Sequence, residues 1–163
     1  MVEKKFVVEG LRFSYSGPFD VVEFYRYIDK WIVDHGMEKE IKKKSEHVTS
    51  KGRKIEWLIE IWMQPMDYAK QVVRLRALFD HVTEAKIKGR KLNKVEALID
   101  IDAILETDIE GRWEQKPLFY FMRAVYDKLV NKFYTNRFEG KLTADAYRLH
   151  KDLTEFFGSY KHI

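Results

Sequence analysis

Basic side chains gather in two short segments of the sequence, and their type and spacing are its clearest indication of binding chemistry. The two groups are Lys51, Arg53 and Lys54, and then Lys86, Lys88, Arg90, Lys91 and Lys94. Lysine and arginine side chains grouped in this way contact phosphates of nucleic acids. If both groups lie at one end of a sheet, their eight charges form an anion-binding edge that suits RNA or a ribonucleoprotein. Lysine-rich turns are also common as plain solvated turns, and this alternative stays open.

Carboxylate side chains are a second candidate for chemistry. Asp100 and Asp102 stand two residues apart in an alternating segment, so they share one face of a strand. Such a pair can bind a hard cation or act as an acid and a base. Arg76 and Lys70 offer matching positive charges, and a solvated, charge-balanced sheet face is the interpretation that we favour.

Other signatures of catalysis are missing from the sequence. The five histidines lack the spacing of metal ligands, and no glycine-rich phosphate loop, nucleophile elbow or zinc-ligand pattern occurs. The absence of cysteine excludes disulfides and thiolate ligands. The sequence therefore makes no positive case for an enzyme, and we predict no catalytic residue, no metal site and no cofactor.

The composition of the 163 residues is that of one folded, highly charged domain, which we place at residues 1–163. The 30 basic and 26 acidic side chains leave a net charge of +4, too small by itself to indicate nucleic-acid binding. No apolar run approaches the roughly 20 residues of a membrane-spanning helix, so we expect a soluble, cytoplasmic protein. Many lysines and glutamates with few glutamines and asparagines indicate a thermophile.

The longest regular pattern predicts an antiparallel hairpin over residues 68–109. Residues 95–109 alternate apolar and polar side chains, which is the period of a strand with one buried face, and residues 88–90 are the expected loop. The pairs expected from this loop are Phe79 with Ile99, Ala77 with Ile101, Leu75 with Ala103, Val73 with Leu105, Arg76 with Asp102 and Lys70 with Asp108. A shift by one residue would turn every apolar side chain to the wrong face, so we expect a well-defined register.

A third strand precedes this hairpin. Residues 54–64 alternate in the same way, and residues 65–67 form a plausible three-residue loop. The pairs expected across that loop are Ile59 with Val73, Trp57 with Leu75 and Glu56 with Arg76. The outer face then carries a charged row of Glu56, Arg76 and Asp102 across three strands.

Two further strands complete the predicted sheet. Residues 40–49, polar on both sides and rich in lysine, suit an exposed edge strand. Residues 6–16 form a first strand with a bulge or bend at Gly10, and the Gly-Pro pair that follows ends it. The two basic segments lie at the same end of this sheet only if residues 79–82 form a bend or bulge within one strand. A true turn there would place them at opposite ends.

Helices account for the rest of the chain. Asp20 caps a first helix that ends at Gly36. Pro117 begins a second helix, Gly140 breaks or bends it, and Thr143 caps a third. This order predicts an α+β fold: an antiparallel sheet of about five strands (β-α-β-β-β-β-α-α), with the first strand beside the last and the helices packed on one face.

The same order is similar to the layout of helix-grip proteins of the START-like kind, in which a curved antiparallel sheet wraps a long carboxy-terminal helix. The similarity covers residues 6 to about 135, and the chain differs in having one helix after its first strand and an extra helix at its end. Short segments such as Glu56-Trp57 and Arg112-Trp113-Glu114 also resemble a group of small, uncharacterised archaeal proteins. That resemblance implies an archaeal source and a shared fold, and it implies no particular activity.

Apolar surfaces offer two alternatives to the basic segments. A helix-grip cavity for an apolar small molecule or a lipid would be lined by Trp57, Ile59, Leu75, Ile101, Met122 and Tyr126. The aromatic residues around the start of the predicted second helix exceed what one apolar stripe needs. Most of them are expected to contact the sheet and the last helix. The alternative is a homo-oligomer face formed by Phe119, Tyr120, Phe133 and Tyr134.

These observations favour a non-catalytic binding or assembly protein that contacts RNA or a protein complex through its basic hairpin turns. A helix-grip carrier of an apolar small molecule or lipid is the alternative. An enzyme that uses the Asp100 and Asp102 face comes third.

Overall fold

The structure of the protein is a computed structural model, which describes residues 2–66, 69–108 and 132–160. Within these residues, long strands form one five-stranded antiparallel sheet, so the predicted α+β class is confirmed. The strands are β1 (Val2–Phe19), β2 (Glu38–Thr49), β3 (Gly52–Met66), β4 (Ala69–Ile87) and β5 (Arg90–Asp108). Their order across the sheet is β1-β5-β4-β3-β2, which places the first strand beside the last and the lysine-rich β2 at an edge, both as predicted.

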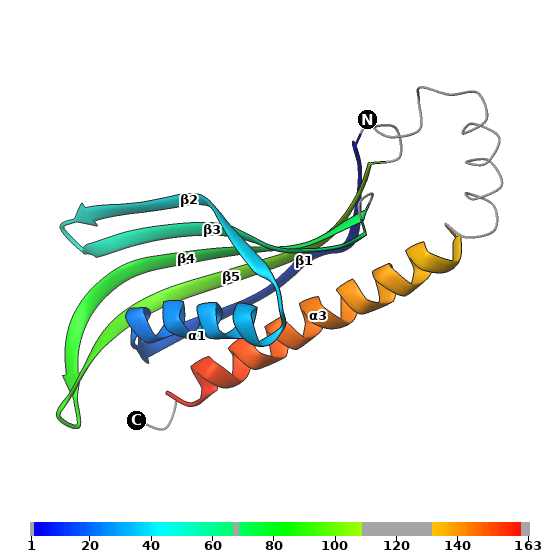
Figure 1. The fold of residues 1–163 in the computed structure, drawn as a ribbon. Helices are drawn as coiled ribbons and strands as arrows, with labels where there is room; N and C mark the ends of the chain where they lie inside the picture. The colour runs from blue at the N-terminus through cyan, green and yellow to red at the C-terminus, as the bar shows by residue number, and fades with distance from the viewer. Residues whose placement is uncertain (1, 67–68, 109–131, 161–163) are drawn as a thin grey trace, which may run out of the picture.

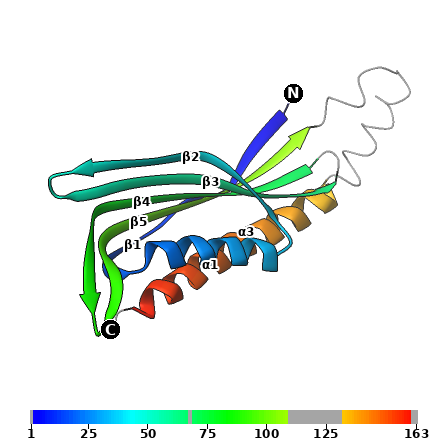
Figure 2. The same ribbon diagram turned by 60° about the vertical axis from the view of Figure 1, so that its left-hand side comes forward.

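Two helices, α1 (Val21–Asp34) and α3 (Lys132–Gly158), lie on the same face of the sheet, as Figures 1 and 2 show. Asp20 caps α1 as predicted, because its side chain accepts hydrogen bonds from the backbone N–H groups of Val22 and Glu23. Gly36 follows the end of α1 with a φ of 65°, in the left-handed region that commonly closes a helix.

Helix α3 is longer than predicted. It continues through Gly140, where we expected a break or a bend, and through Thr143, where we expected a new helix to start. A glycine costs only about 1 kcal/mol in a helix interior, and α3 keeps an apolar face beyond it, where Leu142 and Ala146 are buried in the core. This packing outweighs the weak helix propensity of glycine. The predicted start of another helix at Pro117 lies outside the described residues.

Strand β1 extends further in both directions than the predicted residues 6–16. The bulge expected at Gly10 is present: its φ is 67°, and the register with β5 shifts between Val8 and Leu11. Gly17 and Pro18 were predicted to end the strand, and this prediction was wrong. Both residues lie within β1 and pair with residues of β5. Because β1 is an edge strand, the missing N–H of a proline costs no hydrogen bond to a further strand.

The β4–β5 hairpin has the predicted faces but a different register. The observed pairs are Phe79 with Ala97, Ala77 with Ile99, Leu75 with Ile101, Val73 with Ala103, Arg76 with Asp100 and Lys70 with Glu106, each two residues from the predicted partner. The loop contains two residues, Lys88 and Gly89, whose positive φ values of 51° and 77° are those of a type I′ turn. A further residue is taken up by a bulge between Asp80 and Thr83, where His81 has a φ of 53°.

The register between β3 and β4 was also predicted wrongly by two residues. The observed pairs are Ile59 with Leu75, Trp57 with Ala77, Leu58 with Arg76 and Glu56 with Leu78. The predicted charged row is therefore not straight: Arg76 lies opposite Asp100 and not Asp102. Arg76 still contacts Glu56 on the diagonal, with 3.8 Å between Nη2 and Oε1.

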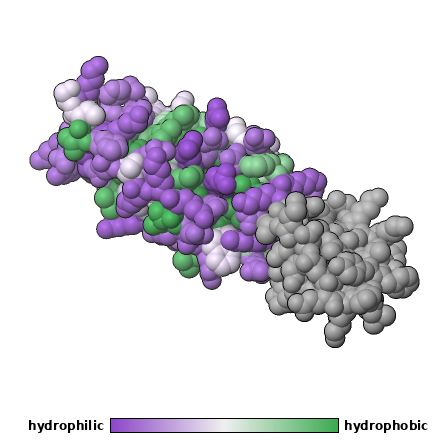
Figure 3. Space-filling model, turned by 90° about the horizontal axis from the view of Figure 1, so that it is seen from above, coloured by the Kyte–Doolittle hydropathy of each residue, from purple (hydrophilic) through white to green (hydrophobic). Residues whose placement is uncertain are grey.

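The core lies between the sheet and the two helices. Aromatic side chains from several elements meet there, among them Phe19 of β1, Phe24 of α1, Phe79 of β4 and Phe157 of α3, with ring centroids 4.9–6.4 Å apart in five of their contacts. The opposite face of the sheet carries no described helix. Figure 3 shows that hydrophilic side chains cover most of it, with hydrophobic side chains between them.

Candidate nucleic-acid interface

Both basic turns lie at the same end of the sheet. Strand β4 is one continuous strand, and residues 79–82 contain a bulge at His81 and no turn, which is the condition on which this placement depended. The turn between Thr49 and Gly52 and the turn at Lys88 and Gly89 therefore lie at the same end of their strands. Figures 1 and 2 show that the β4–β5 hairpin also curls away from β2 and β3, toward the side of the helices.

Half of the eight predicted basic residues have an acidic partner. Arg53 pairs with Glu46 at 2.9 Å, Lys54 with Asp80 at 4.0 Å, Arg90 with Glu23 at 2.8 Å and Lys91 with Glu84 at 3.4 Å. The other four are exposed and form no ion pair with another described residue: Lys51, Lys86, Lys88 and Lys94. Because exposed ion pairs contribute at most about 1 kcal/mol, the paired cations can also exchange partners readily.

A pocket of about 510 Å³ lies between the two hairpins, next to the start of α1. Arg53 of β3 and Lys91 of β5 both line it, so the fold brings one residue from each basic segment to a shared site. Tyr25, Lys44 and Asn93 line the same pocket and were not predicted. No motif in the sequence marks these three residues, because they come from three elements that meet only in the folded chain.

Hydrogen bonds at the start of α1 fix the side of the pocket next to this helix. The Asn93 side chain accepts a hydrogen bond at 3.3 Å from the backbone N–H of Val21, so β5 is fixed to the first residue of the helix. Asp20 takes the next two N–H groups, at 2.9 and 3.3 Å. The first amides of α1 are therefore occupied by this chain's own oxygens, and they do not form an anion site by themselves.

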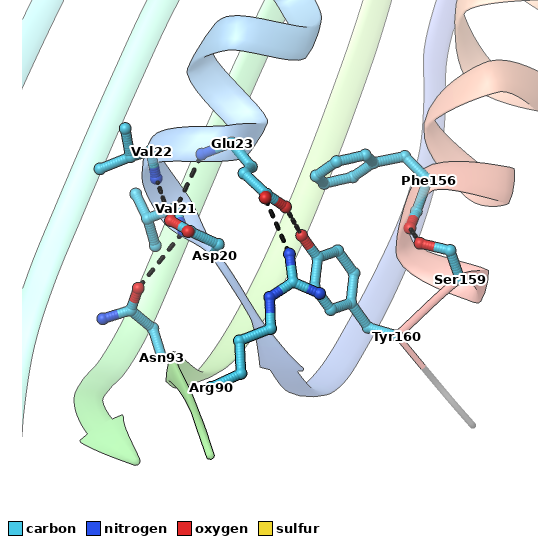
Figure 4. A network of polar contacts seen from close by, with 9 residues as sticks. All are labelled: Asp20, Val21, Val22, Glu23, Arg90, Asn93, Phe156, Ser159 and Tyr160. Carbon is cyan, nitrogen blue, oxygen red and sulfur yellow. Dashed lines mark hydrogen bonds and ion pairs between the residues drawn. The ribbon is translucent and has the colours of Figure 1, made fainter. Parts of the chain in front are cut away.

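A second junction holds the tip of the β4–β5 hairpin against both helices. In Figure 4, the carboxylate of Glu23 in α1 points toward both Arg90 of β5 and Tyr160, which follows α3. Glu23 accepts hydrogen bonds from the Arg90 guanidinium and from the Tyr160 hydroxyl group, and the Arg90 guanidinium lies 5.6 Å from the centre of the Tyr160 ring. Burial, followed by the hydrogen bond to Glu23, raises the pKa of Tyr160 above its usual value of 10.0. Arg90 thus serves the fold and is not a free cation.

A second hollow, of about 460 Å³, adjoins the first along the β4–β5 hairpin. The two share Glu84 and Lys91, and the second also contains Lys86 and Gly89 near the hairpin tip. Together they make an extended depression that starts between the hairpins and reaches Lys86, one of the four unpaired lysines.

The carboxylates considered for catalysis serve the sheet. The backbone N–H of Gly10, at the β1 bulge, donates to Asp102 at 2.7 Å, and the Nε atom of Arg12 lies 3.3 Å from Asp100. No group of three or more His, Asp or Glu side chains within the described part of the chain could hold a metal ion. These contacts favour the charge-balanced sheet face over an acid and base pair.

The four described residues among those proposed for an apolar cavity do not line either pocket. Trp57, Ile59, Leu75 and Ile101 are buried in the core, and the first is 3% exposed and the others 0%. The remaining predicted lining residues and the predicted oligomer face lie outside what the structure describes: Met122, Tyr126, Phe119 and Tyr120, and the side chains of Phe133 and Tyr134.

Comparisons with known proteins give no family for the chain: no family model, no curated protein and no solved structure matches it. Among residues 2–66, 69–108 and 132–160, no helix combines the length and the apolar composition that crossing a membrane requires. The functional argument therefore depends on the site itself.

Proposed function

We propose that the protein is a non-catalytic RNA-binding protein that contacts the sugar–phosphate backbone with the basic end of its sheet. The basic end consists of the eight Lys and Arg residues of the two turns, with Lys51, Lys86, Lys88 and Lys94 as its unpaired cations. The observation that carries the proposal is the convergence of both basic segments on one depression, which Arg53 and Lys91 line from different strands.

The distribution of charge supports a polyanion as the ligand. Unpaired, exposed lysines that contact phosphates displace the cations condensed on a nucleic acid. The release of these cations is the main source of affinity for nucleic acids. Away from the turns several charged side chains of the sheet form ion pairs, as with Arg12 and Asp100 or Lys43 and Glu56, whereas four of the eight basic residues at the turns form none with a described residue. The excess of positive charge at the turns therefore gives the molecule one preferred face for RNA despite its modest net charge.

The apolar-carrier alternative has less support. Its four described residues are packed in the core, and both pockets described above are lined by other residues. A carrier also needs an apolar lining, and the pocket between the hairpins has charged side chains around it.

The test measures the salt dependence of binding of a fluorescently labelled single-stranded RNA by anisotropy. If all four unpaired lysines contact phosphates, the plot of log affinity against log salt concentration has a slope of about −3, from about 0.7 for each contact. The double variant Lys86→Glu, Lys88→Glu should bind more weakly, with a slope less steep by about 1.4.

The matched control is the double variant Lys30→Glu, Lys151→Glu. It makes the same change in net charge at exposed lysines of α1 and α3 that form no ion pair with a described residue. Equal losses of RNA affinity in the two double variants would show that only the net charge of the protein matters and would contradict the proposal. RNA binding that is absent, or that does not weaken with salt, would contradict it as well.

A further inference from the structure

The lining of the pocket between the hairpins is half apolar and electrically balanced. Three basic side chains (Lys44, Arg53, Lys91) and three acidic side chains (Asp20, Glu46, Glu84) contribute to it, so their formal charges cancel. The remaining lining includes aliphatic side chains of α1, β3 and β5. A pocket of this kind favours an uncharged group that has both an apolar surface and polar edges, and the unpaired Lys86 in the adjoining hollow favours a phosphate outside it.

Tyr25 gives the pocket an aromatic wall. Its ring is only partly buried, and Trp57 holds it in an edge-to-face contact, with 4.8 Å between centroids and an angle of 77°. The ammonium group of Lys44 lies 5.1 Å from the ring centre. A fixed, partly exposed tyrosine ring is a surface on which an unpaired nucleic-acid base can stack, whatever its sequence.

Asn93 gives the pocket a polar group suited to a base edge. Its side-chain oxygen is used by the N–H of Val21. The amide nitrogen of the same side chain forms no hydrogen bond with another described residue, so its two N–H groups can donate to a ligand. Because the hydrogen bond to Val21 fixes the side chain, these donors are already oriented.

The volume and the surroundings set the size of the ligand. A pocket of about 510 Å³ falls within the range of roughly 300–1,000 Å³ that is usual for small-molecule sites. The adjoining hollow continues past Lys91 to Lys86, so a ligand that fills the pocket can continue along the hairpin. This arrangement suits one unit of a polymer better than a free metabolite.

From this geometry we infer that the pocket between the hairpins binds one unpaired nucleotide of a single-stranded RNA, with its base against Tyr25 and Asn93. Its phosphates lie along the adjoining hollow, beside Lys86 and Lys91. The inference deepens the proposed function and rests on it, because it specifies single strands and a place for a base where the proposed function requires only phosphates.

The test fills the pocket without changing its charge. Val22 lines the pocket and is 52% exposed, so Val22→Trp places a large side chain in it while the core stays intact. Val33→Trp is the matched control, since Val33 is a 75% exposed valine of the same helix that does not line the pocket. Val22→Trp should weaken binding of single-stranded RNA roughly tenfold, the effect of losing one stacked base, with the salt slope unchanged.

A second measurement uses the unaltered protein and does not depend on how the variant folds. Adenosine and uridine monophosphates are added to isotope-labelled protein, and backbone amide shifts are followed by NMR. Shifts at Val22, Tyr25 and Asn93 with none at Val33 support the inference. A duplex of the same sequence should bind more weakly than the single strand, because paired bases cannot enter the pocket.

The two proposals fail in different ways. Wild-type affinity for single-stranded RNA in Val22→Trp, together with a loss in Lys86→Glu, Lys88→Glu, would overturn the nucleotide pocket and leave the basic end intact. Equal affinity for duplex and single-stranded RNA would also overturn the nucleotide pocket and leave the basic end intact. Tighter binding of single-stranded DNA than of RNA would overturn the assignment to RNA, and no binding to any nucleic acid would end both proposals.

Discussion

Replacing Tyr160 with phenylalanine removes one hydroxyl group from the junction that joins α1, α3 and the β4–β5 hairpin. The ring remains, so its packing against Phe156, with 5.5 Å between centroids, is retained. What is lost is the hydrogen bond to the Glu23 carboxylate. A hydrogen bond to a charged group is worth about 1.5–3 kcal/mol. The side chain of Glu23 is 39% exposed, so water partly replaces the lost donor. We expect the free energy of unfolding to fall by about 1–2 kcal/mol.

The effect should also depend on pH. The pKa of Tyr160 is raised in the folded protein, whereas in the unfolded chain it is close to 10.0. The folded state therefore holds the phenolic proton more tightly, and its contribution to stability is complete below pH 10 and decreases as the pH rises above it. The difference in stability between the wild type and Tyr160→Phe should shrink as the pH rises from about 10 to 11.

Urea denaturation followed by circular dichroism at several pH values measures both effects. In thermal unfolding of a chain of this size, the same loss of unfolding free energy at neutral pH lowers the melting temperature by about 2–8 °C. Tyr147→Phe is the control, because Tyr147 is a 54% exposed tyrosine of α3 without a hydrogen bond to another described side chain. A stability of Tyr160→Phe equal to that of the control, or a difference that stays constant through pH 11, would refute the role given to this junction.

Three further predictions concern the fold. Gly52→Ala should lower the free energy of unfolding by more than about 1 kcal/mol in urea titrations, because Gly52 has a φ of 123° and an added Cβ would lie 3.0 Å from the Val82 carbonyl oxygen. Gly140→Ala should raise it by about 0.5–1 kcal/mol in the same titrations, since nothing lies within 4 Å of the new methyl group in α3. Phe79→Ala should lower the free energy of unfolding by about 3–5 kcal/mol, because Phe79 is fully buried. A loss below about 1 kcal/mol would contradict its place in the core.

Alternating hydrophobicity was sufficient to predict which faces of the strands are buried. The predicted partners were nonetheless wrong by two residues on both sides of β4. Side chains repeat every two residues along a strand, so a shift by two keeps Leu75 and Ala77 on the apolar face. The pattern therefore excludes odd shifts and cannot distinguish between even ones. Loop chemistry decides between them, and the decisive detail is the positive φ of both Lys88 and Gly89, which selects a two-residue turn.

The two ends of α1 and the length of α3 separate features that depend on neighbouring residues from features that depend on tertiary packing. Asp20 and Gly36 act through neighbouring backbone atoms, and both were predicted correctly from residue type. Gly140 was expected to interrupt a helix, because propensity was the only available guide. Buried residues on the later turns of α3 hold the helix together across it. The pocket residues Tyr25 and Asn93 belong to the tertiary class, and only the folded chain brings them together.

The bulge at His81 connects the fold with the proposed site. A non-glycine residue with positive φ is unusual, and here it accompanies a bulge, which bends a strand and increases its twist. Beyond this bulge, β4 and β5 curl toward the helices, and Arg90 reaches Glu23. Gly52 lies directly against the bulge, because a Cβ there would be 3.1 Å from the His81 carbonyl carbon. The first basic turn is thus packed on the bend that positions the second. A substitution that straightens β4 at His81 should therefore separate Arg53 from Lys91 and open the pocket, while leaving every charge of the basic end in place.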